Sequence, residues 1–175
     1  MDMVLHFTKK LSEALRSIEF NEEYYHLPVS LLEVKRIYSN SDEIVAKYGE
    51  LKWKVVDLLN EKYGTHFDLG HWLQGEEKDE VAYFLNEAGS NALNHSEFKF
   101  PCAFQVWMGK KGFVVAVEQK GKGFNASLVD SLKSKTNEGK AFEFFRRCKS
   151  HVFFDDAVNA KMVLMEYVVH TEGYK

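Results

Sequence analysis

The sequence predicts an α+β fold: a two-layer sandwich with a mixed, mostly antiparallel sheet and helices packed on one face. Apolar residues recur at helical spacing up to about residue 95, and from Cys102 onward they recur with the period of two that strands show. Helices and strands do not alternate, which disfavours a doubly wound parallel sheet. Phenylalanine supplies 14 of the 175 residues, and aromatic side chains at this density are typical of a thick helix-on-sheet core.

The N-terminal segment is expected to form a helix of its own. Residues 8–18 carry apolar side chains at helical spacing behind Thr8, whose hydroxyl suits an N-cap. We interpret residues 1–20 as an N-terminal extension helix. Residues 21–175 are interpreted as a single domain, because no long linker rich in Pro, Gly or Ser divides them.

The helical part of the predicted domain follows a short extended run at residues 24–27. Three stretches then show helical spacing, at residues 30–37, 41–63 and about 76–95. Gly64 ends the second of them, at the position where a helix commonly ends in glycine. We therefore expect a long amphipathic helix, a loop, and a second long helix before the sheet.

The predicted strands lie mainly in the second half of the chain. Residues 102–108 and 113–118 alternate as two strands, joined by a turn with a glycine at each end. A glycine-bearing loop and a weakly patterned polar stretch follow. The remaining elements are expected to be a helix at residues 141–150, a strand at 151–155 and a closing strand at 161–170.

Composition excludes several classes of protein. The formal net charge is −3 and the isoelectric point about 6.2, which argues against a general nucleic-acid binder because such proteins need a surplus of Lys and Arg. The two cysteines, Cys102 and Cys148, cannot form a disulfide scaffold or a four-cysteine zinc site. No apolar run approaches the roughly 20 residues of a membrane span. We therefore expect a cytoplasmic protein that binds neither nucleic acid nor membrane.

One predicted helix carries polar residues in a pattern that can support chemistry. Glu87, Asn91 and His95 recur at steps of four, so their side chains project from one narrow face beside an apolar stripe. The alternative interpretation is a solvated polar face, which most such stripes form. A metal site at His66, Asp68 and His71 is a further alternative, but nothing nearby in the sequence supplies the further protein ligand that a zinc site needs.

Two glycine-bearing segments come later in the chain. Gly121 and Gly123 follow the second strand, and glycines at this spacing allow a ligand to approach the backbone closely. Gly139 opens the next predicted helix, where free amide groups at a helix N-terminus can face a phosphate. Each segment alone is also compatible with an ordinary turn.

The order and spacing of these features resemble the GHKL superfamily of ATP-binding domains, which includes gyrase, Hsp90, histidine-kinase and MutL types. The resemblance is strongest to the bacterial anti-sigma-factor serine kinases, and it covers about residues 24–170. The helix motif of those kinases matches this chain at Glu87, Ala88, Asn91, Ala92 and His95. The resemblance implies a histidine-kinase-like ATPase fold for residues 21–175.

The resemblance also implies a role for each matching position. Glu87 would polarise the attacking nucleophile, and Asn91 would coordinate a Mg²⁺ ion that bridges the phosphates of ATP. Residues 126–138 would form a lid. The nucleotide-binding residues that it implies are Asn91, His95, Gln119, Gly121, Gly123 and Gly139.

Three positions depart from the family pattern. Gln119 stands where the family has an aspartate that binds the adenine amino group, and its carbonyl is an uncharged and weaker acceptor. Ala141 and Phe142 stand where the family prefers a glycine and a small aliphatic residue. We therefore expect an ATP-binding regulatory domain with weakened nucleotide binding, and the resemblance implies a serine/threonine kinase or ATPase activity toward a small partner protein.

The alternative function is a non-catalytic protein-interaction module that kept the fold and lost ATP binding. Under both interpretations the expected partner is a protein that regulates signalling or transcription, such as an anti-anti-sigma-like protein. A homodimer is a further form of association that is compatible with both interpretations. A histidine-kinase catalytic domain is disfavoured, because no helix pair with a phosphoacceptor histidine precedes it.

Overall fold

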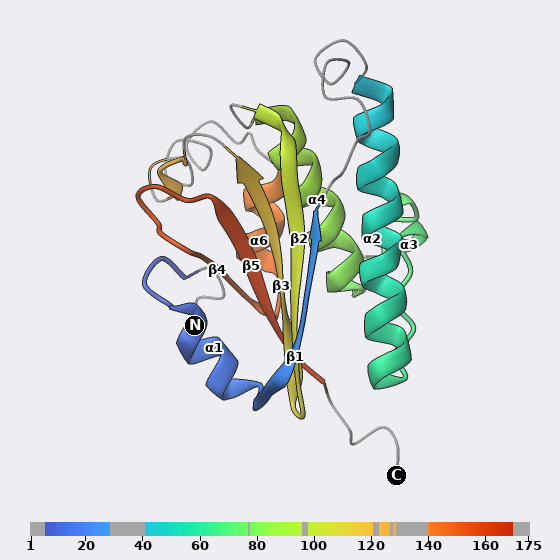
Figure 1. The fold of residues 1–175 in the computed structure, drawn as a ribbon, viewed down its shortest axis with the longest axis vertical. Helices are drawn as coiled ribbons and strands as arrows, with labels where there is room; N and C mark the ends of the chain where they lie inside the picture. Colours follow the sequence, from blue (N-terminus) through green and yellow to red (C-terminus); the bar gives the residue numbers. More distant parts are fainter. Residues whose placement is uncertain are drawn as a thin grey trace.

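The computed structural model describes residues 6–28, 41–76, 78–95, 98–120, 123–126, 128 and 140–169. Five strands form one sheet in the order β1-β2-β3-β5-β4, with the longer helices layered against it (Figure 1). Every pair of neighbouring strands is antiparallel. This arrangement confirms the predicted α+β sandwich. The parallel pairing that a mixed sheet would include does not occur among the described strands.

The elements follow the predicted order. They are α1 (Leu11–Ser17), β1 (Phe20–Pro28), α2 (Ser41–Tyr63), α3 (Gly70–Leu73), α4 (Glu80–His95), β2 (Phe98–Gly109), β3 (Gly112–Lys120), α6 (Lys140–Arg147), β4 (His151–Phe154) and β5 (Met162–Val168).

The bounds of α2 agree with the prediction, and Gly64 adopts φ +65° after its last residue. The one-turn helix α3 was expected to be loop, and α4 begins at Glu80 rather than at residue 76. The predicted helical stretch at residues 30–37 lies outside the described residues.

The tip of the β2–β3 hairpin requires its glycines because other backbone lies against it. A Cβ atom on Gly109 would lie 2.2 Å from the carbonyl oxygen of Ile18, and one on Gly112 would lie 2.0 Å from that of Tyr167. The Tyr63 hydroxyl at the end of α2 lies 2.8 Å from the carbonyl oxygens of both glycines. The hairpin therefore joins the end of α2, the end of α1 and the end of β5.

Both faces of the central strands are apolar, so helices pack on both sides of the sheet. Val115 and Val117 on β3 belong to the core beneath α2, α4 and α6. Val114 and Ala116 belong to a smaller core on the opposite face, together with Ile18 at the end of α1. A strand buried on both faces shows no apolar alternation. The prediction of helices on one face therefore holds for α2, α4 and α6 but is wrong for α1.

The main core is built largely from aromatic rings, as the composition predicted. Phe84 on α4 lies 6.0 Å from Phe145 on α6, measured between ring centroids. Phe142 contacts Phe145 at 5.4 Å and stacks on Phe154 of β4 at 6.1 Å. Phe142 is 2% exposed, so the large residue that departs from the family pattern fills the core between α6 and β4.

Candidate functional site

The candidate site depends on how α4 lies against α6. At the first turn of α4, the Glu80 carboxylate accepts hydrogen bonds from the backbone amides of Lys149 and Ser150 and from the Ser150 hydroxyl, the last at 2.7 Å. One turn later on α4, Phe84 meets Phe145. The helices are therefore antiparallel, and the last turns of α4 lie toward the first residue of α6.

Glu87 is held by a residue that the sequence did not single out. The indole Nε1–H of Trp72, on α3, donates to Glu87 Oε1 at 2.9 Å. Glu87 is half-buried, so one carboxylate oxygen is fixed by Trp72 while the residue keeps access to solvent. The signal for Trp72 in the sequence was only an aromatic residue in an expected loop.

A buried aspartate holds α3 in place. Asp79 is 7% exposed and precedes the first residue of α4. Its carboxylate accepts from the amides of Asp68 at 2.8 Å and Ala82 at 3.0 Å, and it lies 2.7 Å from Nδ1 of His71. The bond to Ala82 is an N-cap, which explains why α4 begins at Glu80. The hydrogen bond to Asp79 raises the pKa of His71.

His71 is thus paired with a carboxylate in the protein. Among the side chains that the structure describes, no group of three or more His, Cys, Asp and Glu residues could hold a metal ion.

A second residue that sequence patterning missed is Lys52 on α2. Its ammonium donates to Asn86 Oδ1 on α4 at 3.0 Å, and Asn86 Nδ2 donates to the carbonyl of Ala82. Burial lowers the pKa of Lys52. Because Asn86 is buried and Lys52 is half-buried, this contact helps to fix α2 against the same helix that carries Glu87.

The end of β3 orients Gln119 and its neighbour Glu118 in opposite directions. Glu118 accepts from Gln105 Nε2 at 3.2 Å and lies 3.5 Å from His26 Nε2, whereas Val117 is buried under the helices. Since side chains alternate along a strand, Gln119 belongs to the helix side and Glu118 to the other side. The backbone amide of Gln119 donates to the backbone carbonyl oxygen of Lys161 at 2.8 Å.

Gly123 makes its close approach to another part of the same chain. A Cβ atom on Gly123 would lie 2.4 Å from Asn159 Oδ1 and 2.5 Å from the Asn159 carbonyl carbon. The next residue, Phe124, exchanges backbone hydrogen bonds with Ala160 at 3.0 and 2.7 Å. The pairing of this loop with the residues before β5 is therefore sufficient to require glycine here.

The structure describes some of the predicted site residues with their side chains, some by their backbone alone, and some not at all. Glu87 is described with its side chain, and Asn91 and His95 lie on the last turns of α4, with side chains outside the described part. Gly121 and Gly139 lie outside the described residues, as does most of the expected lid. The structure thus brings the motif helix toward the start of α6, with Gln119 on the helix side of β3.

Comparison with protein-family models, with curated proteins and with solved structures finds no match to this chain. In the part of the chain that is described, no helix has both the length and the apolar composition to cross a bilayer.

Proposed function

We propose that this chain is a GHKL-like ATP-binding regulatory domain, similar to the anti-sigma-factor serine kinases. One observation carries the proposal: the helix with the matching motif is followed by a hairpin, a loop and α6, and α6 runs antiparallel to it. This direction brings the first turn of α6 toward the Asn91 end of α4. Free amides at a helix N-terminus suit a phosphate.

The available groups fit Mg²⁺ and ATP chemically. Glu87 contributes a carboxylate and Asn91 an amide oxygen, and Mg²⁺ prefers oxygen ligands. When bound, Mg²⁺ would neutralise charge on the phosphates. Asn91 would hold the ion, Gln119 would contact adenine, and Glu87, oriented by Trp72, would accept the proton of the attacking serine hydroxyl.

The proposal extends to the setting of this activity. The substrate would be a serine or threonine of a small partner protein in a cytoplasmic signalling or transcription-control pathway. A homodimer is a second form of association to test, by sedimentation of the purified chain.

A thermal-shift titration with ATP, ADP and GTP, each with and without Mg²⁺, tests the proposal. A ligand that binds only the native state raises the melting temperature by mass action. We expect ATP to raise it only when Mg²⁺ is present, and Asn91→Ala to remove the Mg²⁺ dependence. Asn60→Ala is unsuitable as a control because Asn60 supports the loop before α3, so Asn21→Ala on β1 serves instead.

A second candidate function is an interaction module without nucleotide. The observation that favours it is Gly123, whose close approach is made with Asn159 of the same chain. Under this proposal no nucleotide changes the melting temperature at any Mg²⁺ concentration. The first proposal is then abandoned and the chain acts through protein contacts alone.

A further inference from the structure

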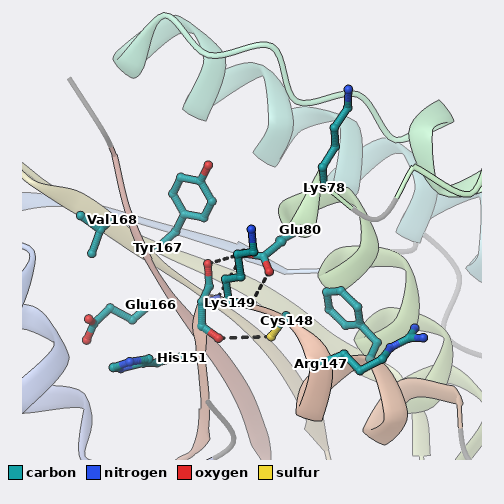
Figure 2. A pocket seen from close by; sticks show the side chains of 11 residues that line it. Lys78, Glu80, Arg147, Cys148, Lys149, His151, Glu166, Tyr167 and Val168 are labelled. Atoms are coloured by element: carbon teal, nitrogen blue, oxygen red, sulfur yellow. Dashed lines mark hydrogen bonds between the residues drawn. The ribbon is translucent and has the colours of Figure 1, made fainter. Parts of the chain in front are cut away.

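A cavity of about 790 Å³ opens at the end of α4 opposite to the candidate nucleotide site. It lies where the start of α4, the end of α6 and the strands β4 and β5 meet (Figure 2). Its volume is within the range of small-molecule sites. Along α4, Glu80 and Asn91 are separated by roughly 16 Å at 1.5 Å per residue, so the cavity is a separate location.

Both carboxylates that line the cavity already have partners within the protein. Glu80 accepts two backbone amides and the Ser150 hydroxyl. Glu166 is 5% exposed, lies 2.9 Å from the ammonium of Lys9 and accepts from the Ser17 hydroxyl at 3.2 Å. Lys9 lies outside the lining, so the charge of Glu166 is balanced from the other side of the sheet.

The lining carries a surplus of cations over these carboxylates. Lys78, Arg147 and Lys149 line the cavity, and Arg147 also lies 3.6 Å from Glu143 in an exposed pair of the kind that contributes little. In Figure 2 the Arg147 guanidinium and the Lys78 ammonium both point away from Tyr167. Among the described residues Lys78 has no acidic partner such as Glu143, so Lys149, and Lys78 after rotation of its flexible side chain, are the cations that can supply charge.

Apart from Ser150 and from His151, whose Nδ1 lies 2.9 Å from the Lys9 ammonium, the remaining wall is mostly apolar. Phe144, Tyr167 and Val168 contribute to it. The Cys148 thiol donates to the carbonyl oxygens of Phe145 and Ser150, and burial raises the pKa of this thiol to about 12. Cys148 is thus a protonated core residue rather than a nucleophile, and the wall favours binding over covalent chemistry.

We propose that this cavity binds a small organic anion, a phosphate or carboxylate joined to an apolar group. Lys78 and Lys149 would pair with the acid, and the wall of Phe144 and Tyr167 would cover the apolar part. Both interactions are needed, because exposed ammonium groups alone attract anions without discrimination.

Titration of the ¹⁵N-labelled full chain with phenyl phosphate, benzoate and benzyl alcohol tests the proposal. We expect saturable shifts of the Lys149 and Ser150 amide signals with at least one acid, and none with the neutral alcohol. If only phenyl phosphate saturates these shifts, the cavity accepts a phosphate. If benzoate saturates them as well, it also accepts a carboxylate. Saturation by neither acid, or equal saturation by the alcohol, overturns the proposal.

Charge variants identify the residues responsible. Lys149→Gln and Lys78→Gln should each weaken binding about fivefold, the effect of one charge-assisted contact, and Lys149→Arg should restore it. Lys54→Gln, which removes an exposed lysine from α2, is the matched control. Unchanged affinity in the Lys149→Gln, Lys78→Gln double variant contradicts the proposal. Because the probes lack adenine and the signals lie at the α6–β4 turn, failure here leaves the nucleotide proposal standing.

Discussion

At the N-terminal end of α4, Asp79 and Glu80 together accept hydrogen bonds from four backbone amides, a hydroxyl and an imidazole. Further along the same helix, one hydrogen bond, from Trp72, is seen at Glu87. The first pair of carboxylates ties three segments of the chain together, and their loss would leave several donors unsatisfied. Within the described residues, the second carboxylate oxygen of Glu87 makes no such contact. The comparison separates acidic residues that hold the fold from the one that we propose acts on a ligand.

Asp79→Ala should show the largest effect on stability. It removes the N-cap of α4 and leaves the Asp68 amide and His71 without their acceptor, so we expect a loss of about 2–4 kcal/mol in the free energy of unfolding. Urea denaturation measures it, with the exposed Asp57→Ala on α2 as the control. A loss of stability no greater than that of the control would show that Asp79 contributes no more to stability than an exposed aspartate.

Gly123→Ala should be the next most harmful change, because the new methyl group would overlap Asn159. We expect a loss of about 1–3 kcal/mol, the range for overpacking. Gly49→Ala on α2, where a Cβ atom meets nothing within 4 Å, is the control and should be neutral or stabilising. Unchanged stability in Gly123→Ala would show that the loop does not need its pairing with the residues before β5.

The His71–Asp79 pair predicts a pH dependence. Its hydrogen bond raises the pKa of His71 above the ordinary 6.5, with smaller contributions from Glu76 and Asp68. The folded state therefore binds the proton more tightly than the unfolded state. This contribution to stability is fully present below about pH 6.5 and is lost as the pH rises through the folded-state pKa.

Comparison of wild type with His71→Gln isolates this effect from the other histidines. The difference between their free energies of unfolding should shrink as the pH is raised from below 6.5 into the alkaline range. A constant difference would mean that His71 contributes packing but no charge.

Glu87→Gln should have the smallest effect on stability, because the amide oxygen of glutamine still accepts from Trp72. We expect a change below about 0.5 kcal/mol, while ATP turnover falls about 100-fold with loss of the general base. Denaturation and phosphate release measure the two quantities on the same preparation. A destabilisation comparable to that of Asp79→Ala would show that Glu87, like Asp79, mainly stabilises the fold.

Local patterns were enough to predict most elements of the fold. Helix α2 is long and amphipathic and is followed by Gly64, and the turn between β2 and β3 is bounded by Gly109 and Gly112. Helix α3 was missed because four residues show no periodicity, and it depends on Asp79 further along the chain. The side of the sheet that α1 covers was also not predictable, since β3 is apolar on both faces.

The candidate site could be predicted less completely than the fold. The spacing of Glu87 and Asn91 placed both on one helix, which the structure confirms for the backbone. The contact from Trp72 joins residues 15 apart in sequence, and Gly123 meets Asn159 across a longer separation. Such tertiary contacts leave no periodic signal, so only the folded chain shows them.

Calorimetric titration of the wild type and of Gln119→Asp with ATP and Mg²⁺ tests the central claim most directly. The aspartate restores a charged acceptor for adenine, which is worth about 1 kcal/mol, or roughly a fivefold change in affinity. We predict weak, Mg²⁺-dependent binding to the wild type and several-fold tighter binding to Gln119→Asp. No heat for the wild type at millimolar ATP, together with no gain in Gln119→Asp, would contradict the assignment of a nucleotide site at this end of α4.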